Sequence, residues 1–279
     1  MYRLLTVELY KIFSRPRSYI GFVAIAILIF IIQLALYSDG TTYLSFLMQQ
    51  LEVSFFIQGN ILNGYLITYV ILQTLIIQMP LLVTLVTGDL LSGEASAGTI
   101  RLLATKPVSR ASIITAKFIA GSFYTLLLVI WLGGLALTFG LLIFKQGDLM
   151  VLSSDHLTIV PAAECLWRFL VACLVAFISL SVVSTFSLML SCFFDNSIVP
   201  IITTMSVIII FTIIGTLDVP MFNHIKPFLF TTHMVVWQKL FADPIPVSTI
   251  MNSMAVMLVH IVGFMCVTYY RFIKKDILS

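Results

Sequence analysis

Long apolar runs divide this chain, and polar residues gather in the stretches between them. A membrane-spanning helix needs about 20 mainly apolar residues, and six segments meet that length within the uncertainty of their ends. They are Tyr19–Tyr37, Tyr65–Thr87, Phe118–Phe144, Phe169–Phe194, Ile198–Leu217 and Ile250–Tyr270. The pattern therefore predicts an all-α polytopic membrane protein with six transmembrane helices, in which residues 1–279 form one transmembrane domain. Pro80 predicts a bend in the second span, because proline removes a helical hydrogen bond.

The residues before the first span, 1–17, predict an amphipathic helix at the membrane surface. In a helix over Tyr2–Ser14 the apolar residues Leu5, Leu9, Ile12 and Phe13 share one face, and the polar residues Arg3, Glu8 and Lys11 lie elsewhere. A continuous extension of the first span is the alternative, and Pro16 disfavours it. The first span lacks an obvious small-residue cleavage site, so we expect it to be retained.

A second unusual segment, residues 218–249, precedes the last span. It is too short and polar to cross a membrane and too apolar for an ordinary loop, and prolines bracket it at both ends. Segments of this kind are often re-entrant or interfacial, so we expect a re-entrant outer loop. His224 and His233 lie in it, but their spacing of nine residues matches no common metal-ligand pattern, which favours interfacial polar positions.

Composition supports the membrane class and narrows the function. The chain is 60% apolar and 10% charged, with a mean hydropathy of +1.11, whereas soluble domains carry about 25% charged residues. The net charge of +3 argues against a nucleic-acid partner. The four cysteines are scattered, which predicts neither disulfides nor a metal site.

Lysine and arginine predict the orientation, since they collect in cytoplasmic loops. With six spans, both termini and the loops after the second and fourth spans share one side. That side carries eleven basic residues: Arg3, Lys11, Arg15, Arg17, Arg101, Lys106, Arg110, Lys117, Arg271, Lys274 and Lys275. The other side carries four: Lys145, Arg168, Lys226 and Lys239. Both termini and residues 88–117 are therefore expected in the cytoplasm.

The spans are poor in charge, which disfavours an ion-coupled carrier driven within this chain. Ser181, Ser184, Ser187 and Ser191 recur at helical spacing on the fourth span. They indicate close helix packing, with a hydroxyl-lined substrate path as the alternative. His260, near the middle of the sixth span, is either a hydrogen-bonded packing residue or a proton relay.

The cytoplasmic insert, residues 88–117, is the most charged part of the chain. Read as one helix, SGEASAGTIRLLATKP places Ala97, Ile100 and Ala104 on one face and Glu94, Gly98 and Arg101 on another. Pro107 predicts a turn, after which Ser109 is expected to cap a helix leading into the third span.

Gly98 is costly in this reading, because a glycine inside a helix loses about 0.8–1 kcal/mol relative to alanine. A closely approaching partner would explain it. A helix lying on the inner leaflet is the alternative, and Glu94 fits it poorly. The two-faced insert therefore predicts a helix that docks into a groove of a cytoplasmic partner.

The stretch Gly88–Gly121, GDLLSGEASAGTIRLLATKPVSRASIITAKFIAG, resembles the cytoplasmic loop of type-2 ABC transporter permeases. That family's pattern is an acidic residue, then Gly-Thr, a Leu-rich turn, P-[VI]-[ST]-R and a lysine entering the third span. The matching residues are Glu94, Gly98, Thr99, Leu102, Leu103, Pro107, Ser109, Arg110 and Lys117. Over the rest of the chain the resemblance is architectural.

The resemblance implies a coupling helix that sits in a cleft of a separate ATP-binding subunit. Two such ATPases would join two permeases, either two copies of this chain or one copy and a related permease. The residues expected to couple to the ATPase are Glu94, Gly98, Thr99, Ile100, Arg101, Leu102, Leu103, Pro107, Ser109 and Arg110. ATP and Mg would bind the partner, since this chain contains no GxxxxGK[ST] phosphate loop.

The resemblance thus predicts the permease subunit of an ATP-driven exporter in the bacterial cytoplasmic membrane. This chain itself is expected to be no enzyme and to bind no cofactor. The alternative is a membrane anchor or signalling scaffold that recruits a cytoplasmic ATPase without moving a solute. The charge-poor spans make the transported substrate unpredictable, with lipid, hydrophobic peptide, drug and antibiotic cargo all compatible.

Overall fold

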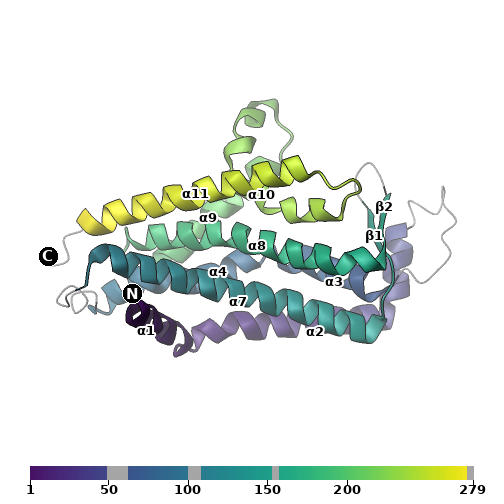
Figure 1. The fold of residues 1–279 in the computed structure, drawn as a ribbon, viewed down its shortest axis with the longest axis horizontal. Helices are drawn as coiled ribbons and strands as arrows, with labels where there is room; N and C mark the ends of the chain where they lie inside the picture. The colour runs from purple at the N-terminus through teal and green to yellow at the C-terminus, as the bar shows by residue number, and fades with distance from the viewer. Residues whose placement is uncertain (49–61, 100–107, 153–156, 275–279) are drawn as a thin grey trace.

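The structure is a computed structural model that describes residues 1–48, 62–99, 108–152 and 157–274. Its helices run side by side along one long axis (Figure 1). In chain order, the elements of the bundle are α1 (Tyr2–Phe13), α2 (Arg17–Met48), α3 (Gly64–Leu75), α4 (Met79–Thr87), α5 (Asp89–Ser96), α7 (Arg110–Phe144), β1 (Leu149–Leu152), β2 (Leu157–Val160), α8 (Ala162–Ser191), α9 (Ile198–Thr216) and α11 (Val247–Lys274). Between α9 and α11 come four short elements, η1 (Pro220–His224), η2 (Lys226–Phe228), α10 (Phe230–Met234) and η3 (Val236–Phe241).

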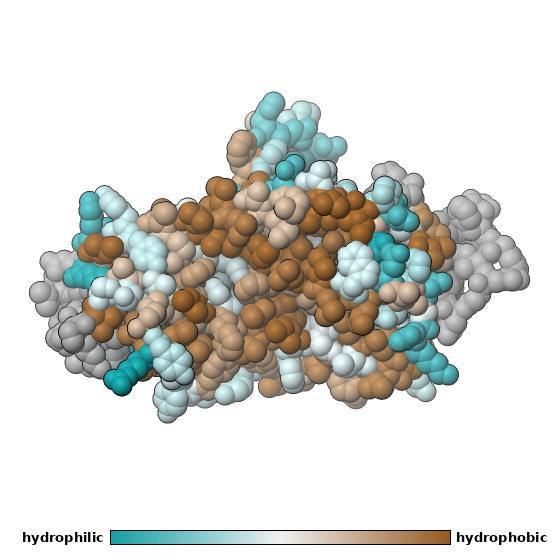
Figure 2. Space-filling view, in the orientation of Figure 1, coloured by the Kyte–Doolittle hydropathy of each residue, from teal (hydrophilic) through white to brown (hydrophobic). Residues whose placement is uncertain are grey.

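Five helices of the described chain are long and apolar enough to cross a membrane: α2 up to Gly40, α7, α8, α9 and α11. The pair formed by α3 and the stretch from α4 through α5 becomes a sixth if it is counted as one span. These helices are typical of an all-α polytopic membrane protein, the class that the apolar runs predict. Apolar side chains cover the middle of the face in Figure 2, and hydrophilic ones gather toward the two ends.

The second predicted span is bent, as Pro80 indicates. Helix α3 ends at Leu75 and α4 begins at Met79, with Pro80 in its first turn, and the two segments meet at 52°. A proline is tolerated there because the first N–H groups of a helix have no intrahelical acceptor. The bend turns α4 and α5 against α8, so the break in the span positions the start of the polar insert.

The N-terminal helix is separate from the first span, as predicted. Helix α1 ends at Phe13 and α2 begins at Arg17, and the hydroxyl of Ser18 donates across the break to the Ile12 carbonyl at 2.5 Å. Ile12 is buried, and α1 lies along α7. Glu8 is buried too, so α1 turns a carboxylate as well as its apolar residues toward the bundle.

Helix α8 lies at the centre of the bundle and packs against α4, α5, α7, α9 and α11. Its four regularly spaced serines, Ser181, Ser184, Ser187 and Ser191, are all buried. Ser181 donates to the Phe177 carbonyl one turn earlier, at 2.7 Å. The positions of these serines agree with the packing interpretation of the sequence.

One end of the bundle carries the β1–β2 hairpin, and we call it the hairpin end (Figure 1). The strands pair antiparallel, with Leu149 opposite Val160 and Leu152 opposite Leu157. Asn63 holds the hairpin to α3, because its side chain caps the first turn of α3 and donates to the Asp148 carbonyl at 2.8 Å. The prediction of helices and loops alone missed this hairpin.

The segment before the last helix divides into two parts. Its first part, through η1 and η2, projects from the side of the bundle (Figure 1). Its second part buries three aromatic side chains, Phe230, Trp237 and Phe241. Arg168 of α8, expected in a loop, is buried and donates to the carbonyls of Leu240 and Ala242 at 3.1 Å each. The second part is therefore packed into the bundle, while its depth in a bilayer stays a prediction.

Two of the three histidines named in the sequence analysis, His233 and His260, have local partners. His233 bonds Ser253 at 3.0 Å and the Pro227 carbonyl at 2.9 Å, which joins α10 to α11. His260 bonds the Val256 carbonyl one turn earlier, at 2.8 Å, and its ring packs against Phe230. These contacts favour the packing interpretation of His260.

Candidate functional site at the base of the insert

The N-terminus, the end of α11 and the described ends of the insert lie together at the end of the bundle opposite the hairpin (Figure 1). We call this the insert end. There α1, the start of α2, α5 and the start of α7 meet around a group of charged side chains, the insert-end charge cluster. Its members are Glu8, Lys11, Arg15, Arg17, Asp89, Glu94 and Lys117.

Lys117 of α7 is the centre of the cluster and is only 1% exposed. Its Nζ lies 2.8 Å from Oε2 of Glu8, 2.8 Å from Oε1 of Glu94 and 2.8 Å from the Leu90 carbonyl oxygen. The ammonium donates hydrogen bonds to Glu8 and to the Leu90 carbonyl, and it forms an ion pair with Glu94. One side chain of α7 thus binds α1 and α5 together.

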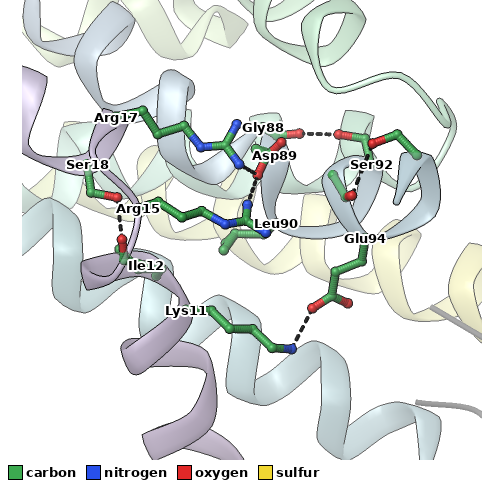
Figure 3. Close-up of polar contacts among 12 residues, drawn as sticks. Lys11, Ile12, Arg15, Arg17, Ser18, Gly88, Asp89, Leu90, Ser92 and Glu94 are labelled. Carbon is green, nitrogen blue, oxygen red and sulfur yellow. Dashed lines mark hydrogen bonds and ion pairs between the residues drawn. The ribbon is translucent and has the colours of Figure 1, made fainter. Parts of the chain in front are cut away.

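Lys11 contacts the same two glutamates as Lys117. Its Nζ lies 2.8 Å from Glu8 and 2.6 Å from Oε1 of Glu94, and Figure 3 shows it reaching from α1 toward α5. Glu8 and Glu94 are 2% and 4% exposed, whereas a third of the Lys11 side chain is exposed. The two lysines and two glutamates form a closed set of four charges that balance one another.

Asp89, at the start of α5, forms the second part of the cluster. Arg15 and Arg17, on either side of the α1–α2 break, both donate to its Oδ2 (Figure 3). Asp89 is buried and stands in the first turn of a helix, where a negative charge also interacts favourably with the helix dipole. The break at Pro16 therefore places two arginines on one carboxylate.

Gly93 explains how the Asp89 carboxylate fits. A Cβ atom at Gly93 would overlap all three atoms of that carboxylate group, closer than non-bonded atoms can approach. The residues lie four apart in α5 and so share one face. Glycine at position 93 leaves room for Asp89 to face the arginines.

Helix α5 is also fixed to α8 by a serine. The Ser191 hydroxyl oxygen accepts hydrogen bonds from the backbone N–H groups of Leu91 and Ser92, at 3.1 Å and 2.8 Å. The first N–H groups of a helix have no acceptor within it. Ser191 of a neighbouring helix supplies that acceptor, so α5 is held from α1, α7 and α8 at once.

The cluster shifts the pKa of two side chains in opposite directions. Burial alone would raise the pKa of Glu8, but the Lys117 charge and the hydrogen bonds from Lys11 and Lys117 outweigh it, so the pKa lies below its ordinary 4.5. Burial alone would lower the pKa of Lys11, but its hydrogen bonds to Glu8 and Glu94 raise it above 10.5. Both residues are therefore charged across the neutral pH range.

The structure corrects the expected shape of the insert. Helix α5 ends at Ser96, and Gly98 has a φ of +69°, in the left-handed region that favours glycine. The Gly98 N–H donates to the Ala95 carbonyl at 3.0 Å, which is typical of a residue that ends a helix. Position 98 is thus not inside a helix. The positive φ explains why a glycine stands there, and no closely approaching partner is needed.

Glu94 is likewise not on an exposed charged face with Gly98. Its carboxylate points into the bundle, toward Lys11 and Lys117. Thr99, the next residue of the family pattern, donates from its hydroxyl to the Glu94 carbonyl at 3.3 Å. The prediction is wrong here because the helix ends before Gly98 and because Lys117 is buried, so that the Glu94 carboxylate faces it inside the bundle.

The second half of the insert agrees with the sequence where it is described. Ser109 caps α7 by accepting from the Ser112 N–H at 3.1 Å, as predicted. Arg110 donates to the Ile273 carbonyl at 2.8 Å, which fixes the start of α7 to the end of α11. The remaining coupling residues, Ile100, Arg101, Leu102, Leu103 and Pro107, lie outside the described residues.

Sequence reasoning missed most of the cluster, namely Glu8, Lys11, Arg15, Arg17 and Asp89 as partners. A signal existed: two acidic residues, Asp89 and Glu94, flank the start of the insert in a chain with only twelve acidic residues. Buried carboxylates require cationic partners, and Arg15 and Arg17 are on the same predicted side. In the described part of the chain, no group of three or more His, Cys, Asp or Glu side chains could hold a metal ion.

A helical membrane bundle with a buried charge cluster that joins the two described ends of a polar insert is the class that this fold and site define. Within that class, the chain belongs to the family described as "Protein of unknown function (DUF2705)", whose model matches residues 18–278. A search of curated proteins found no match. The matched region begins after α1, so it includes Asp89, Glu94 and Lys117 but not Glu8 or Lys11.

Proposed function

We propose that this chain is the permease subunit of an ATP-driven ABC exporter and that its insert contacts a separate cytoplasmic ATP-binding subunit. The observation that carries the proposal is the insert-end charge cluster. It ties both sides of the insert, α5 through Glu94 and α7 through Lys117, to each other and to α1. A partner that moves residues 100–107 would therefore move three helices together.

The helices attached to the insert suit this role. Helix α7 is continuous over 35 residues, from Arg110 at the insert end to Phe144 at the hairpin end. At a rise of 1.5 Å per residue, it is about 52 Å long. On the other side, α5 leads through α4 to the bend near Pro80. One rigid helix and one hinged pair thus leave the insert, an arrangement suited to a hinge-type transition.

The partner that we propose, an ATP-binding subunit, is based on the resemblance of the insert to that of type-2 ABC permeases. Under this proposal, two ATPase subunits bind ATP and Mg, and two permeases, copies or relatives, form the path. The working unit would lie in the bacterial cytoplasmic membrane with both chain termini in the cytoplasm. Glu94 and Lys117 would then hold the insert in place, and the residues beyond Gly98 would make the contacts to the ATPase.

Co-purification with the ATPase encoded by a neighbouring gene tests the proposal. The double variant Arg101→Glu, Leu103→Asp changes one charge and one apolar residue of the insert. We expect it to reduce recovery of the ATPase with the permease and to lower the ATPase activity of the complex. The matched control, Val219→Asp, Lys226→Glu, makes the same two kinds of change in the segment that projects from the bundle and should alter neither measurement.

Two outcomes would count against the proposal. Equal recovery and activity for the insert variant and its control would show that the insert does not couple to the ATPase. A stable complex whose ATPase activity stays the same with and without cargo, and which transports nothing into vesicles, would favour the scaffold alternative.

A further inference from the structure

An apolar groove of about 720 Å³ lies between α2 and α7. Its floor includes Ile29 and Gln33, both buried, and its walls include Phe30, Tyr37, Trp131 and Phe139, which are all well exposed. Ligand sites in proteins measure about 300–1,000 Å³ and combine apolar and aromatic walls with a few polar groups. The groove has both the size and the wall chemistry of a ligand site.

The position of the groove along the helices matches one leaflet of a bilayer. On α2 it extends from Ala26 to Tyr37, and on α7 from Trp131 to Ile143. At 1.5 Å per residue these stretches are about 16 Å and 18 Å long, and half of a 30 Å hydrocarbon core is about 15 Å. If Arg17 marks the boundary at the insert end, Ala26 lies about 14 Å deeper. The groove therefore runs from mid-membrane to the boundary at the hairpin end.

The side chains around the groove suit a flexible apolar chain better than a second helix. Helices pack closely in membranes through small residues at their contact. The rims here carry large side chains instead, including Phe30, Leu34, Tyr37 and Phe139, each more than 40% exposed. A helix of a second copy would be held away by these rims, whereas a single hydrocarbon chain fits between them.

Gln33 gives the groove one polar group on its floor. It is 3% exposed, and its amide donates to the Ala136 carbonyl at 3.4 Å. That carbonyl already accepts from Thr68 at 3.1 Å, so α7 does not need Gln33 to satisfy it. By the same rise per residue, Gln33 lies about 24 Å from Arg17, about 6 Å inside the far boundary of a 30 Å hydrocarbon core, and Tyr37 lies at that boundary, about 30 Å from Arg17.

We propose that this groove binds one acyl chain of a membrane lipid from the leaflet at the hairpin end, with Gln33 and Tyr37 near the polar end of that chain. The proposal rests on the apolar helices and the groove, and is independent of any ATPase partner.

The test uses the full-length chain in lipid nanodiscs that contain a phosphatidylcholine with a photoreactive diazirine in one acyl chain. After illumination, mass spectrometry maps the labelled residues. We expect labelling of Phe30, Leu34 and Trp131 that saturates as the probe fraction rises and that unlabelled phosphatidylcholine competes away. Exposed positions outside the groove, such as Leu170 of α8 and Val259 of α11, should be labelled weakly and in proportion to probe.

Ala26→Trp fills the deep end of the groove, and Ala24→Trp is its matched control. Both alanines are half-buried on α2, but only Ala26 lines the groove. We expect Ala26→Trp to reduce groove labelling about tenfold, the change that 1.4 kcal/mol of lost binding free energy produces. Ala24→Trp should leave the labelling within about twofold of the wild type, and the melting temperatures of both variants show that they are folded.

Three results would overturn the proposal. Equal, unsaturable labelling of the groove and of Leu170 would mean ordinary annular lipid. Unchanged labelling in a folded Ala26→Trp variant would mean that the probe lies elsewhere. Absent labelling together with Phe30→Cys cross-linking between two copies would show that a second chain fills the groove.

Discussion

At the insert end, seven charged side chains from four segments gather in one cluster, whereas at the hairpin end aromatic rings do most of the joining. There Trp237 and Phe241 pack against Tyr69 at ring distances of 5.7 Å and 5.2 Å, and Phe169 packs against Phe241 at 4.7 Å. Arg168 adds hydrogen bonds to two backbone carbonyls. Both ends fix segments that are far apart in the chain, but by different interactions.

Because the two ends are held by different interactions, they should respond differently to substitutions. Aromatic packing is short-ranged, is shared among many atoms and does not depend on protonation. The charge cluster depends on a few hydrogen bonds to charged groups, and losing one partner leaves another charge buried and unpaired. The insert end should therefore respond to a single substitution as a unit, while the hairpin end should lose stability in proportion to the volume removed.

Lys117→Met is expected to have the largest effect. Methionine preserves most of the side-chain length but removes the buried cation between Glu8 and Glu94, which leaves the partly exposed Lys11 to balance both carboxylates. Removing one partner of a buried ion pair costs about 3–5 kcal/mol. The free energy of unfolding, measured in detergent or bicelles, should fall by that amount. Lys274→Met, on the exposed end of α11, is the control and should cost less than about 1 kcal/mol; equal losses would contradict a central role for Lys117.

Trp237→Ala tests the hairpin end. Trp237 is 1% exposed and contacts Tyr69 and Phe241, so alanine would leave a cavity. We expect a loss of about 3 kcal/mol in the free energy of unfolding, at the low end for such a truncation. Trp237→Phe should cost clearly less, because it keeps a ring in the site. If phenylalanine and alanine cost the same, packing of the ring is not what holds this segment.

Gly93→Ala should have an intermediate effect at the insert end. The added Cβ would collide with the Asp89 carboxylate, and relief of such overpacking typically costs about 1–3 kcal/mol. Gly134→Ala is the matched control, since no atom of another group lies within 4 Å of the position that its Cβ would take on α7. That control should be neutral or stabilising by about 0.8–1 kcal/mol, the helix-propensity gain of alanine. A neutral Gly93→Ala would mean that Asp89 can leave Arg15 and Arg17 without loss.

The pH dependence of stability should differ between the insert end and the hairpin end, and this is the smallest of the expected effects. The pKa of Glu8 is lowered, so its contribution to stability is present above pH 4.5 and is lost as the pH falls through the lowered value. The pKa of Lys11 is raised, so its contribution is present below pH 10.5 and is lost as the pH rises through the raised value. The contributions of Glu8 and Lys11 are therefore both fully present between pH 4.5 and pH 10.5.

The contribution of the Glu8 charge to stability can be measured by comparing the melting temperatures of the wild type and of Glu8→Gln over a range of pH. The difference between the two should be constant near neutral pH and should shrink as the pH falls below 4.5. The difference between the wild type and Trp237→Ala should not shrink in the same way. A Glu8→Gln difference that persists at low pH would mean that the Glu8 charge contributes nothing to stability.

Much of the fold was predictable because a bilayer imposes length and apolarity on each helix. The six apolar runs correspond to α2, the α3–α4 pair, α7, α8, α9 and α11. The break at Pro16, the bend at Pro80 and the Ser109 cap follow from local rules on proline and on helix N-termini. The β1–β2 hairpin was missed, because strand pairing over two four-residue segments leaves a weak periodic signal.

The candidate site was predictable only in part. Sequence placed Glu94 and Lys117 in one polar insert, and their separation of 23 residues gave no reason to pair them. Gly98 is a second example of what local patterns do not predict. A glycine in a helical pattern is expected to destabilise the helix, but in the structure the left-handed φ of Gly98 ends α5. Local patterns describe the preferences of a segment, not what the rest of the chain brings next to it.

The sequence by itself determined that this chain forms apolar helices, where they bend, and that one polar insert separates two of them. These properties depend on solvent and local backbone geometry, which act on each segment independently. Only the tertiary structure decided that Glu8 of α1 meets Lys117 of α7 across 109 residues, and that a groove opens between α2 and α7. The physical reason is that burying a charge is favourable only with a partner in place, and the partner is chosen by how the helices pack.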